Sequence, residues 1–268
     1  MIKKKISWIG LLTAVSLFGL MLTGCGSSPA ADSKEIKIGG NFELTGGVAN
    51  YGKQTMNGVQ LAFKEANAAG GVLGKKLVLV TADNKSEPSE ATNAITKLIT
   101  QDKVSLVMGP VASSNVLATL QVGQDNKIPV LTATGTNTKI TVDNGKVRPY
   151  AFRSCFIDPF QGTVMANFAT KTLKAKTAVI FTDNSSDYSK GLAESFEAQL
   201  VKNGGTIVGK EAFLQKDQDF KSTLTKIKVM NADTIFIPAY YEEVGKIAKQ
   251  ARELGINTPL IGTDGFDD

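Results

Sequence analysis

The 268-residue sequence contains no histidine, two cysteines and one tryptophan. Histidine is the usual general base near neutral pH and the commonest metal ligand, so its absence excludes Ser-His-Asp and Cys-His nucleophiles and His-zinc sites. Two cysteines allow at most one disulfide and cannot supply a cysteine-ligated zinc. The G-x-S-x-G signature of many serine hydrolases is also missing. We therefore expect a protein that is not an enzyme and that carries no cofactor or metal.

The formal charge of +5 comes largely from the N-terminus. Three lysines, Lys3–Lys5, precede an apolar stretch over residues 6–21. This stretch has the length of a signal-peptide core and is short for a transmembrane helix. Removal of residues 1–24 with their three lysines would leave a charge of about +2. Because no later segment interleaves a basic run with aromatic residues, the sequence does not favour nucleic-acid binding.

The apolar stretch ends in Leu-Thr-Gly-Cys at residues 22–25. This order resembles the bacterial lipobox, whose cysteine is acylated and becomes the mature N-terminus. The resemblance implies a lipoprotein signal peptide over 1–24, a lipid on Cys25 and a flexible Gly-Ser-Pro-Ala tether over 25–34. Two or more acyl chains anchor a protein stably to a membrane. The alternative is an ordinary signal peptide that happens to contain a cysteine. With the lipid anchor, the mature domain is extracytoplasmic and held at the bacterial cell membrane.

From Glu35 onward, short β-branched runs alternate with amphipathic stretches, which is typical of βαβ units and parallel sheets. We expect strands over 36–39, 77–82, 104–108, 128–131, 178–181, 206–208, 234–237 and 260–262. We expect helices over 52–68, 88–101, 113–125, 159–173, 190–202, 220–230 and 244–254. The pattern of helices and strands in the second half of the chain weakly resembles that in the first half. This similarity predicts two similar α/β lobes with a crossing near residues 150–157.

Hydroxyl residues precede two of the expected helices and are predicted to cap them. Ser86 or Ser89 is placed to cap the helix over 88–101, and Ser113 or Ser114 the helix that follows the third strand. The segments after the strands are rich in Gly, Ser, Thr, Asn, Tyr and Asp. Because ligands of parallel sheets bind beyond the carboxyl ends of the strands, these segments predict a site for a small polar ligand between the lobes.

Seven stretches of the mature chain occur in the order seen in one protein family. The stretches are IKIGGNFELTGGVANYGKQTMNGVQLAFKEANAAGGVLGKKL, VSLVMGPVASSNVLA, IPVLTATGTN, YAFRSCFIDPFQG, DYSKGLAESF, DFKSTLTKIK and YYEEVGKIAKQARELGINTPLIGTDG. Through them the chain resembles the substrate-binding lipoproteins of ABC importers for branched-chain amino acids (Leu/Ile/Val-binding type). The resemblance implies the bilobal type I periplasmic-binding fold, with two Rossmann-like lobes that close on an amino acid. It also implies a monomer that delivers its ligand to an ABC permease.

The resemblance implies partners for the two charges of a bound amino acid. Ser113 corresponds to the serine that binds the ligand carboxylate, which would also gain from the N-terminus of the following helix. Thr136 corresponds to the threonine that contacts both carboxylate and ammonium, and Gly135 offers its carbonyl to the ammonium. Asp264 corresponds to the acidic partner of the ammonium, because a buried cation needs an opposite charge.

Three aromatic residues complete the implied site. Tyr188 and Tyr240 correspond to second-lobe residues that close over the ligand, and Tyr51 to an aromatic residue that lines the pocket for the ligand side chain. Thr132 and Ala133 replace a Ser-Pro pair common in the family. This departure leaves the side-chain preference open.

The same resemblance sets the expected domain boundaries. Lobe 1 is expected over 35–153, lobe 2 over 154–259, and the start of a return to lobe 1 over 260–268. Members of the family continue well beyond this point, so we expect a truncated chain whose C-terminal part is missing and whose unfinished first lobe exposes an apolar surface. Two alternatives stay open: a signalling receptor of the same fold for amides, urea or other small acids, and a secreted enzyme.

Overall fold

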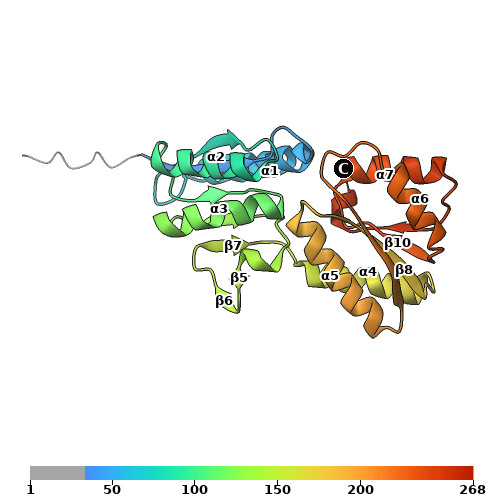
Figure 1. The fold of residues 1–268 in the computed structure, drawn as a ribbon. Coiled ribbons are helices and arrows are strands. Elements are labelled where there is room, and N and C mark those ends of the chain that lie inside the picture. Colours follow the sequence, from blue (N-terminus) through green and yellow to red (C-terminus); the bar gives the residue numbers. More distant parts are fainter. Residues whose placement is uncertain (1–33, 268) are drawn as a thin grey trace, which may run out of the picture. The chain divides into compact units, whose positions relative to one another are not determined.

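The computed structural model describes residues 34–267, which form two parallel β-sheets with helices packed on them (Figure 1). The first sheet has the order β2-β1-β3-β4-β7 and the second the order β11-β10-β8-β9. The strands of the first sheet are β1 (Glu35–Phe42), β2 (Lys76–Asp83), β3 (Val107–Met108), β4 (Val130–Thr132) and β7 (Ala151–Arg153). Those of the second are β8 (Thr177–Asp183), β9 (Thr206–Phe213), β10 (Thr234–Phe236) and β11 (Leu260–Ile261).

Helices alternate with these strands, as the apolar periodicity predicts. They are α1 (Ala49–Ala68), α2 (Pro88–Thr100), α3 (Ser113–Asn126), α4 (Asp158–Asn167), α5 (Asp187–Lys202), α6 (Lys221–Val229) and α7 (Tyr241–Glu253). The segment Phe168–Thr172 continues α4 as a π-helical turn. Within the described part of the chain, no helix combines the length and apolarity that crossing a bilayer requires.

The first sheet buries one face more completely than the other. Val107, Val130 and Ala151 lie in one row across β3, β4 and β7 and pack into a core with α2 and α3. Side chains alternate along a strand, so the neighbouring row points to the opposite face. That row ends in Phe152, which is 49% exposed. Beside it, an apolar groove runs between α1 and the sheet, lined by Thr55, Gly58, Val59, Ala62, Phe63, Met108 and Ala133. The first sheet thus carries an exposed apolar surface of the kind expected.

The second sheet buries both of its faces. On one face, α4 and α5 pack over a core that includes Phe196 and Phe236, whose rings stack with centroids 4.0 Å apart. On the other face, α6 and α7 pack over Phe181, Phe213 and Phe220. Helices on both faces of a parallel sheet are the doubly wound arrangement. The fold class expected from the sequence, α/β with two Rossmann-like parallel sheets, is confirmed.

Three strands were missed by the sequence analysis. β7 lies in the segment assigned to the crossing between lobes, where it is the fifth strand of the first sheet. β5 (Val142–Asp143) and β6 (Lys146–Val147) form a two-stranded antiparallel ribbon. Their sequences, Val-Asp, Lys-Val and Ala-Phe-Arg, lack the apolar run that marked equally short strands such as β3 and β11. The expected domain boundaries stay predictions, although Leu260 and Ile261 lie in the second sheet because β11 pairs with β10.

A buried carboxylate, and no serine side chain, binds the backbone immediately before α3. The backbone N–H groups of Val111 and Ala112 donate to the carboxylate of Glu43, at 3.0 and 3.1 Å. Asn115 Nδ2 donates to the same group at 2.8 Å. Burial raises the pKa of Glu43, and these hydrogen bonds oppose that shift. The predicted serine cap of α3 is therefore wrong.

The predicted serine cap of α2 is wrong as well. Its N-cap residue is Glu87, with no capping side chain, and a proline occupies the first turn. Ser86 Oγ instead donates to the Thr45 carbonyl, at 2.8 Å, and so ties the loop after β2 to the loop after β1. A serine hydroxyl near the start of a helix can bond to several nearby backbone groups, and here it bonds to a carbonyl in the loop after β1 instead of capping the helix.

We expect Glu43→Ala to destabilise the chain by about 3 kcal/mol or more, because it leaves two buried N–H groups and the Asn115 amide without an acceptor. Equilibrium unfolding in urea measures the loss. Glu65→Ala is the matched control, since Glu65 lies on the exposed side of α1, and it should change the free energy of unfolding by less than about 0.5 kcal/mol. Equal stability of the two variants would contradict the role given to Glu43.

Candidate functional site

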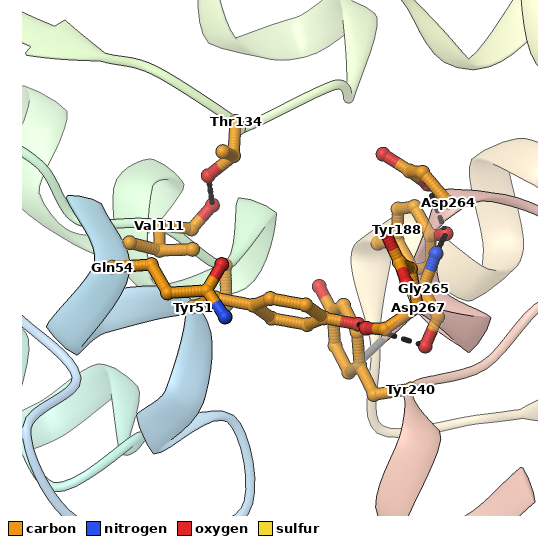
Figure 2. A pocket seen from close by; sticks show the side chains of 10 residues that line it. Tyr51, Gln54, Val111, Thr134, Tyr188, Tyr240, Asp264, Gly265 and Asp267 are labelled. Carbon is orange, nitrogen blue, oxygen red and sulfur yellow. Dashed lines mark hydrogen bonds between the residues drawn. The ribbon is translucent and has the colours of Figure 1, made fainter. Parts of the chain in front are cut away.

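A cavity of about 210 Å³ lies where strand ends of the two sheets meet. Figure 2 shows its lining from α1, from the segments after β3 and β4, and from the segment after β11. This position beyond the carboxyl ends of parallel strands is the one predicted. The lining residues are Tyr51, Gln54, Val111, Ala112, Thr134, Tyr188, Tyr240, Asp264, Gly265 and Asp267.

Tyr188 and Asp264 form the polar side of the cavity. The Tyr188 hydroxyl donates to Asp264 Oδ1 at 2.5 Å and accepts from the Gly265 N–H at 2.9 Å. Burial raises the pKa of Tyr188 well above its usual value, and the Asp264 charge adds to this, so the phenol stays a donor. A Cβ at position 265 would lie 2.8 Å from the Tyr188 hydroxyl, so this approach requires glycine. Asp264 itself is exposed and accessible from the cavity.

Three tyrosine rings, including that of Tyr188, line the cavity next to Asp264. Tyr188 and Tyr240 stack with centroids 4.8 Å apart, and Tyr51 meets Tyr240 edge-on at 6.2 Å. From α1 on the first sheet, Tyr51 donates its hydroxyl to backbone carbonyls of Gly265 and Asp267 (Figure 2). One tyrosine side chain thus connects the first-sheet half of the site to the segment that holds Asp264.

Four of the seven predicted site residues, Tyr51, Tyr188, Tyr240 and Asp264, line this cavity, and the other three are not among its lining residues. Ser113 is buried, and its Oγ accepts from the Asn137 N–H at 3.2 Å. The carbonyl of Gly135 accepts from Arg153 Nη1 at 3.0 Å, so one of its acceptor positions is already used. Thr136 is buried, and its Oγ1 has no hydrogen-bond partner among residues 34–267.

The sequence analysis missed the residues that form much of the cavity surface. Val111 and Ala112 supply apolar wall immediately before α3, and Gln54 lies one turn after Tyr51. Thr134 lines the cavity in place of Gly135, with its Oγ1 donating to the Val111 carbonyl at 3.0 Å. The spacing of Gln54 from Tyr51 on a helix was a usable signal. Whether Gly135 or Thr134 lines the cavity depends on the backbone conformation of the loop, which the sequence pattern does not specify.

A buried polar cluster borders the same site and was also missed. Both carboxylate oxygens of Asp158, and the amide nitrogen of Gln161, make no hydrogen bond of normal geometry in the described part of the chain, although the Thr136 hydroxyl acts on the Asp158 carboxylate. Gln161 Oε1 accepts from the Asp264 N–H at 3.1 Å, so the cluster touches the acidic side of the cavity. Burial raises the pKa of Asp158 to about 7, and the charge of Asp264 pushes it in the same direction.

The arrangement suits a small molecule with an apolar part and two opposite charges. Asp264 offers a carboxylate to a cation, and the first turn of α3 offers N–H groups for which the helix has no acceptor. Tyrosine rings and the Val111–Ala112 wall provide apolar contact. Among the described residues, no three histidine, cysteine, aspartate or glutamate side chains gather as a metal site would require.

Comparison with known proteins agrees with this geometry. The family model described as "Periplasmic binding protein" matches residues 35–268. The Leu/Ile/Val-binding protein BraC3 of Rhizobium johnstonii is 34% identical over 255 residues, which are 95% of this chain and 68% of that protein. An amino acid binding protein of Pseudomonas aeruginosa is 32% identical over 86% of this chain and 61% of its own length.

Two solved structures extend the comparison to three dimensions. The LivJ substrate-binding protein of Streptococcus pneumoniae, solved in complex with isoleucine, has 44% identity and a TM-score of 0.79, covering 87% of this chain and 65% of that one. The leucine-binding protein LivK of Thermotoga maritima has 38% identity and a TM-score of 0.81, covering 87% and 64%. The chain therefore spans about two thirds of the length of these relatives. The chain belongs to the periplasmic binding protein family, in its branched-chain amino acid binding branch.

Proposed function

We propose that this protein is an extracytoplasmic receptor that captures a branched-chain or related amino acid between its two sheets and delivers it to an ABC permease. The observation that carries the proposal is the cavity itself, which combines an accessible carboxylate at Asp264 with apolar wall at Val111 and Ala112. Neither feature alone selects an amino acid over an apolar acid or a simple amine.

In this proposal the ligand ammonium lies beside Asp264 and Thr136, and its carboxylate near Ser113 and the first turn of α3. The hydroxyl of Ser113 accepts from Asn137, which leaves its proton free to donate to a carboxylate. Tyr51, Tyr188 and Tyr240 enclose the side chain. Gly135 contributes through the loop that it shares with Thr134 and Thr136.

Contacts from both sheets favour a closed state when ligand is bound, since only then does the ligand reach both sets of partners. The protein holds its ligand and performs no chemistry on it. It acts as a monomer, and a lipid on Cys25, which lies outside the described residues, anchors it to the membrane. Residues 1–24 are the signal peptide that directs this processing.

We expect calorimetric titration with L-isoleucine or L-leucine to give saturable binding. Asp264→Asn should weaken it at least tenfold, because a hydrogen bond to a charged partner contributes about 1.5–3 kcal/mol. Asp125→Asn makes the same change at an exposed position near the far end of α3 and should leave affinity unchanged. No binding of leucine, isoleucine or valine by the unaltered chain would refute this ligand class.

For the anchor, growth of bacteria that express the chain with an alkyne-tagged fatty acid should label the protein. Cys25→Ser should abolish the label, because no other residue supplies the acylated thiol. Cys155→Ser is the matched control and should keep it: burial raises the pKa of the Cys155 thiol to about 11, so it is a poor nucleophile. Label that persists in Cys25→Ser would contradict the anchor.

A further inference from the structure

Four buried polar atoms that make no hydrogen bond of normal geometry with residues 34–267 lie behind the acidic side of the cavity. They are Thr136 Oγ1, the two carboxylate oxygens of Asp158, and Gln161 Nε2. Their side chains belong to residues that are 1%, 1% and 7% exposed. The Thr136 hydroxyl still lies close enough to the Asp158 carboxylate to lower its pKa, so these two side chains interact with each other. More than nine tenths of buried polar groups in folded proteins have a hydrogen-bond partner, so this concentration in one place points to a missing polar group.

The backbone holds the three residues against one another. The Asp158 N–H donates to the Thr136 carbonyl at 3.1 Å, and Gln161 follows one turn later on α4. Position 191 on α5 must be glycine, because a Cβ there would lie 2.4 Å from Asp158 Oδ2. The carboxylate of Asp158 is therefore fixed between α4, α5 and the loop after β4.

The cluster also connects to the proposed ammonium partner. Gln161 Oε1 accepts from the Asp264 N–H at 3.1 Å, so Asp158 and Asp264 lie on two sides of one glutamine. In the unliganded chain, two negative charges here would repel each other without a compensating cation. Because Asp158 is the more deeply buried of the two, it is the group on which a proton is retained.

We infer that a ligand ammonium entering between Thr136 and Asp264 expels a proton from Asp158, so that binding is coupled to proton release. This inference rests on the proposed function. The step balances: Asp158 goes from carboxylic acid to carboxylate, its proton passes to solvent, and the ammonium supplies the compensating charge. A buffer component accepts the proton, and no other reactant is needed.

The charged groups around Asp158 are compatible with this exchange. Those that line the adjoining cavity or act on it electrostatically are Lys139, Arg153, Asp187, Lys190, Glu194 and Asp264. The guanidinium of Arg153 is already bound to the carbonyls of Gly135 and Asn137. The pKa of the Cys155 thiol is raised by burial to about 11, and burial raises that of the Tyr240 phenol well above its usual value, so neither titrates near neutral pH.

The sign of the pH dependence follows from burial. The pKa of Asp158 is raised to about 7 in the empty protein, mainly by desolvation, and a nearby cation lowers it. Below this pH, binding must displace the proton, so affinity increases as pH rises toward 7 and levels off above it. The maximum slope is about tenfold in affinity per pH unit, which corresponds to one proton released.

The test is calorimetry with L-isoleucine near pH 6 in two buffers of different ionisation enthalpy, which counts the protons released. The unaltered protein should release between half a proton and about one proton per ligand. Asp158→Asn should release none and bind with a flat pH profile between about pH 5.5 and 7. Asp125→Asn, which removes an exposed carboxylate near the far end of α3 that is not among the groups acting on Asp158, should keep the release.

Each outcome has one meaning. Binding by the unaltered protein with no proton release overturns the inference and leaves the proposed function intact; a water molecule in the cluster would give this result. Release that persists in Asp158→Asn, or is lost in Asp125→Asn, overturns the assignment to Asp158. Absence of binding at every pH refutes the proposed function itself. The proton count of the unaltered protein needs no variant, so a poorly folding Asp158→Asn would not leave the question open.

Discussion

The half of the site formed by the first sheet depends on the buried carboxylate of Glu43. It accepts hydrogen bonds from Val111, Ala112 and Asn115, and so ties the end of β1 to the start of α3. The two backbone groups it binds belong to residues that form the apolar wall of the cavity. Because the first N–H groups of the α3 segment are already satisfied internally, only the next ones, from Ser113 onward, are available to an anionic ligand group.

The second sheet contributes a matching acidic half. The Tyr188 hydroxyl donates a hydrogen bond to the Asp264 carboxylate, and Gln161 Oε1 accepts one from the Asp264 backbone N–H. Tyr51 then connects the two halves through carbonyls at Gly265 and Asp267. Fixed donors on one side and a fixed carboxylate on the other suit a molecule whose opposite charges are separated by one carbon. We infer that Asp158, buried behind them, makes this side of the site sensitive to pH.

Periodicity in the sequence predicted the alternating elements well, because long amphipathic helices and β-branched runs carry strong signals. It failed for β5, β6 and β7, which lack the apolar run that marked equally short strands such as β3 and β11. The site residues, such as Tyr188 and Asp264, were predicted instead from the resemblance to the Leu/Ile/Val-binding family. The sequence analysis missed Glu43 and Asp158, since a buried carboxylate looks the same in sequence as a solvated one. A buried carboxylate is distinguished only by its surroundings in the fold. Glu43 accepts a hydrogen bond from Val111 in a distant segment, whereas the carboxylate of Asp158 is buried without a hydrogen bond of normal geometry in the described part of the chain.

The central claim, that the cavity takes a zwitterionic amino acid in one orientation, is tested most directly by a crystal structure with bound L-isoleucine. The account predicts the ligand ammonium beside Asp264 and Thr136, its carboxylate beside Ser113 and the first turn of α3, and its side chain among the tyrosines. An amino acid bound in the reverse orientation, or outside the cavity lined by Tyr51 and Tyr240, would contradict it.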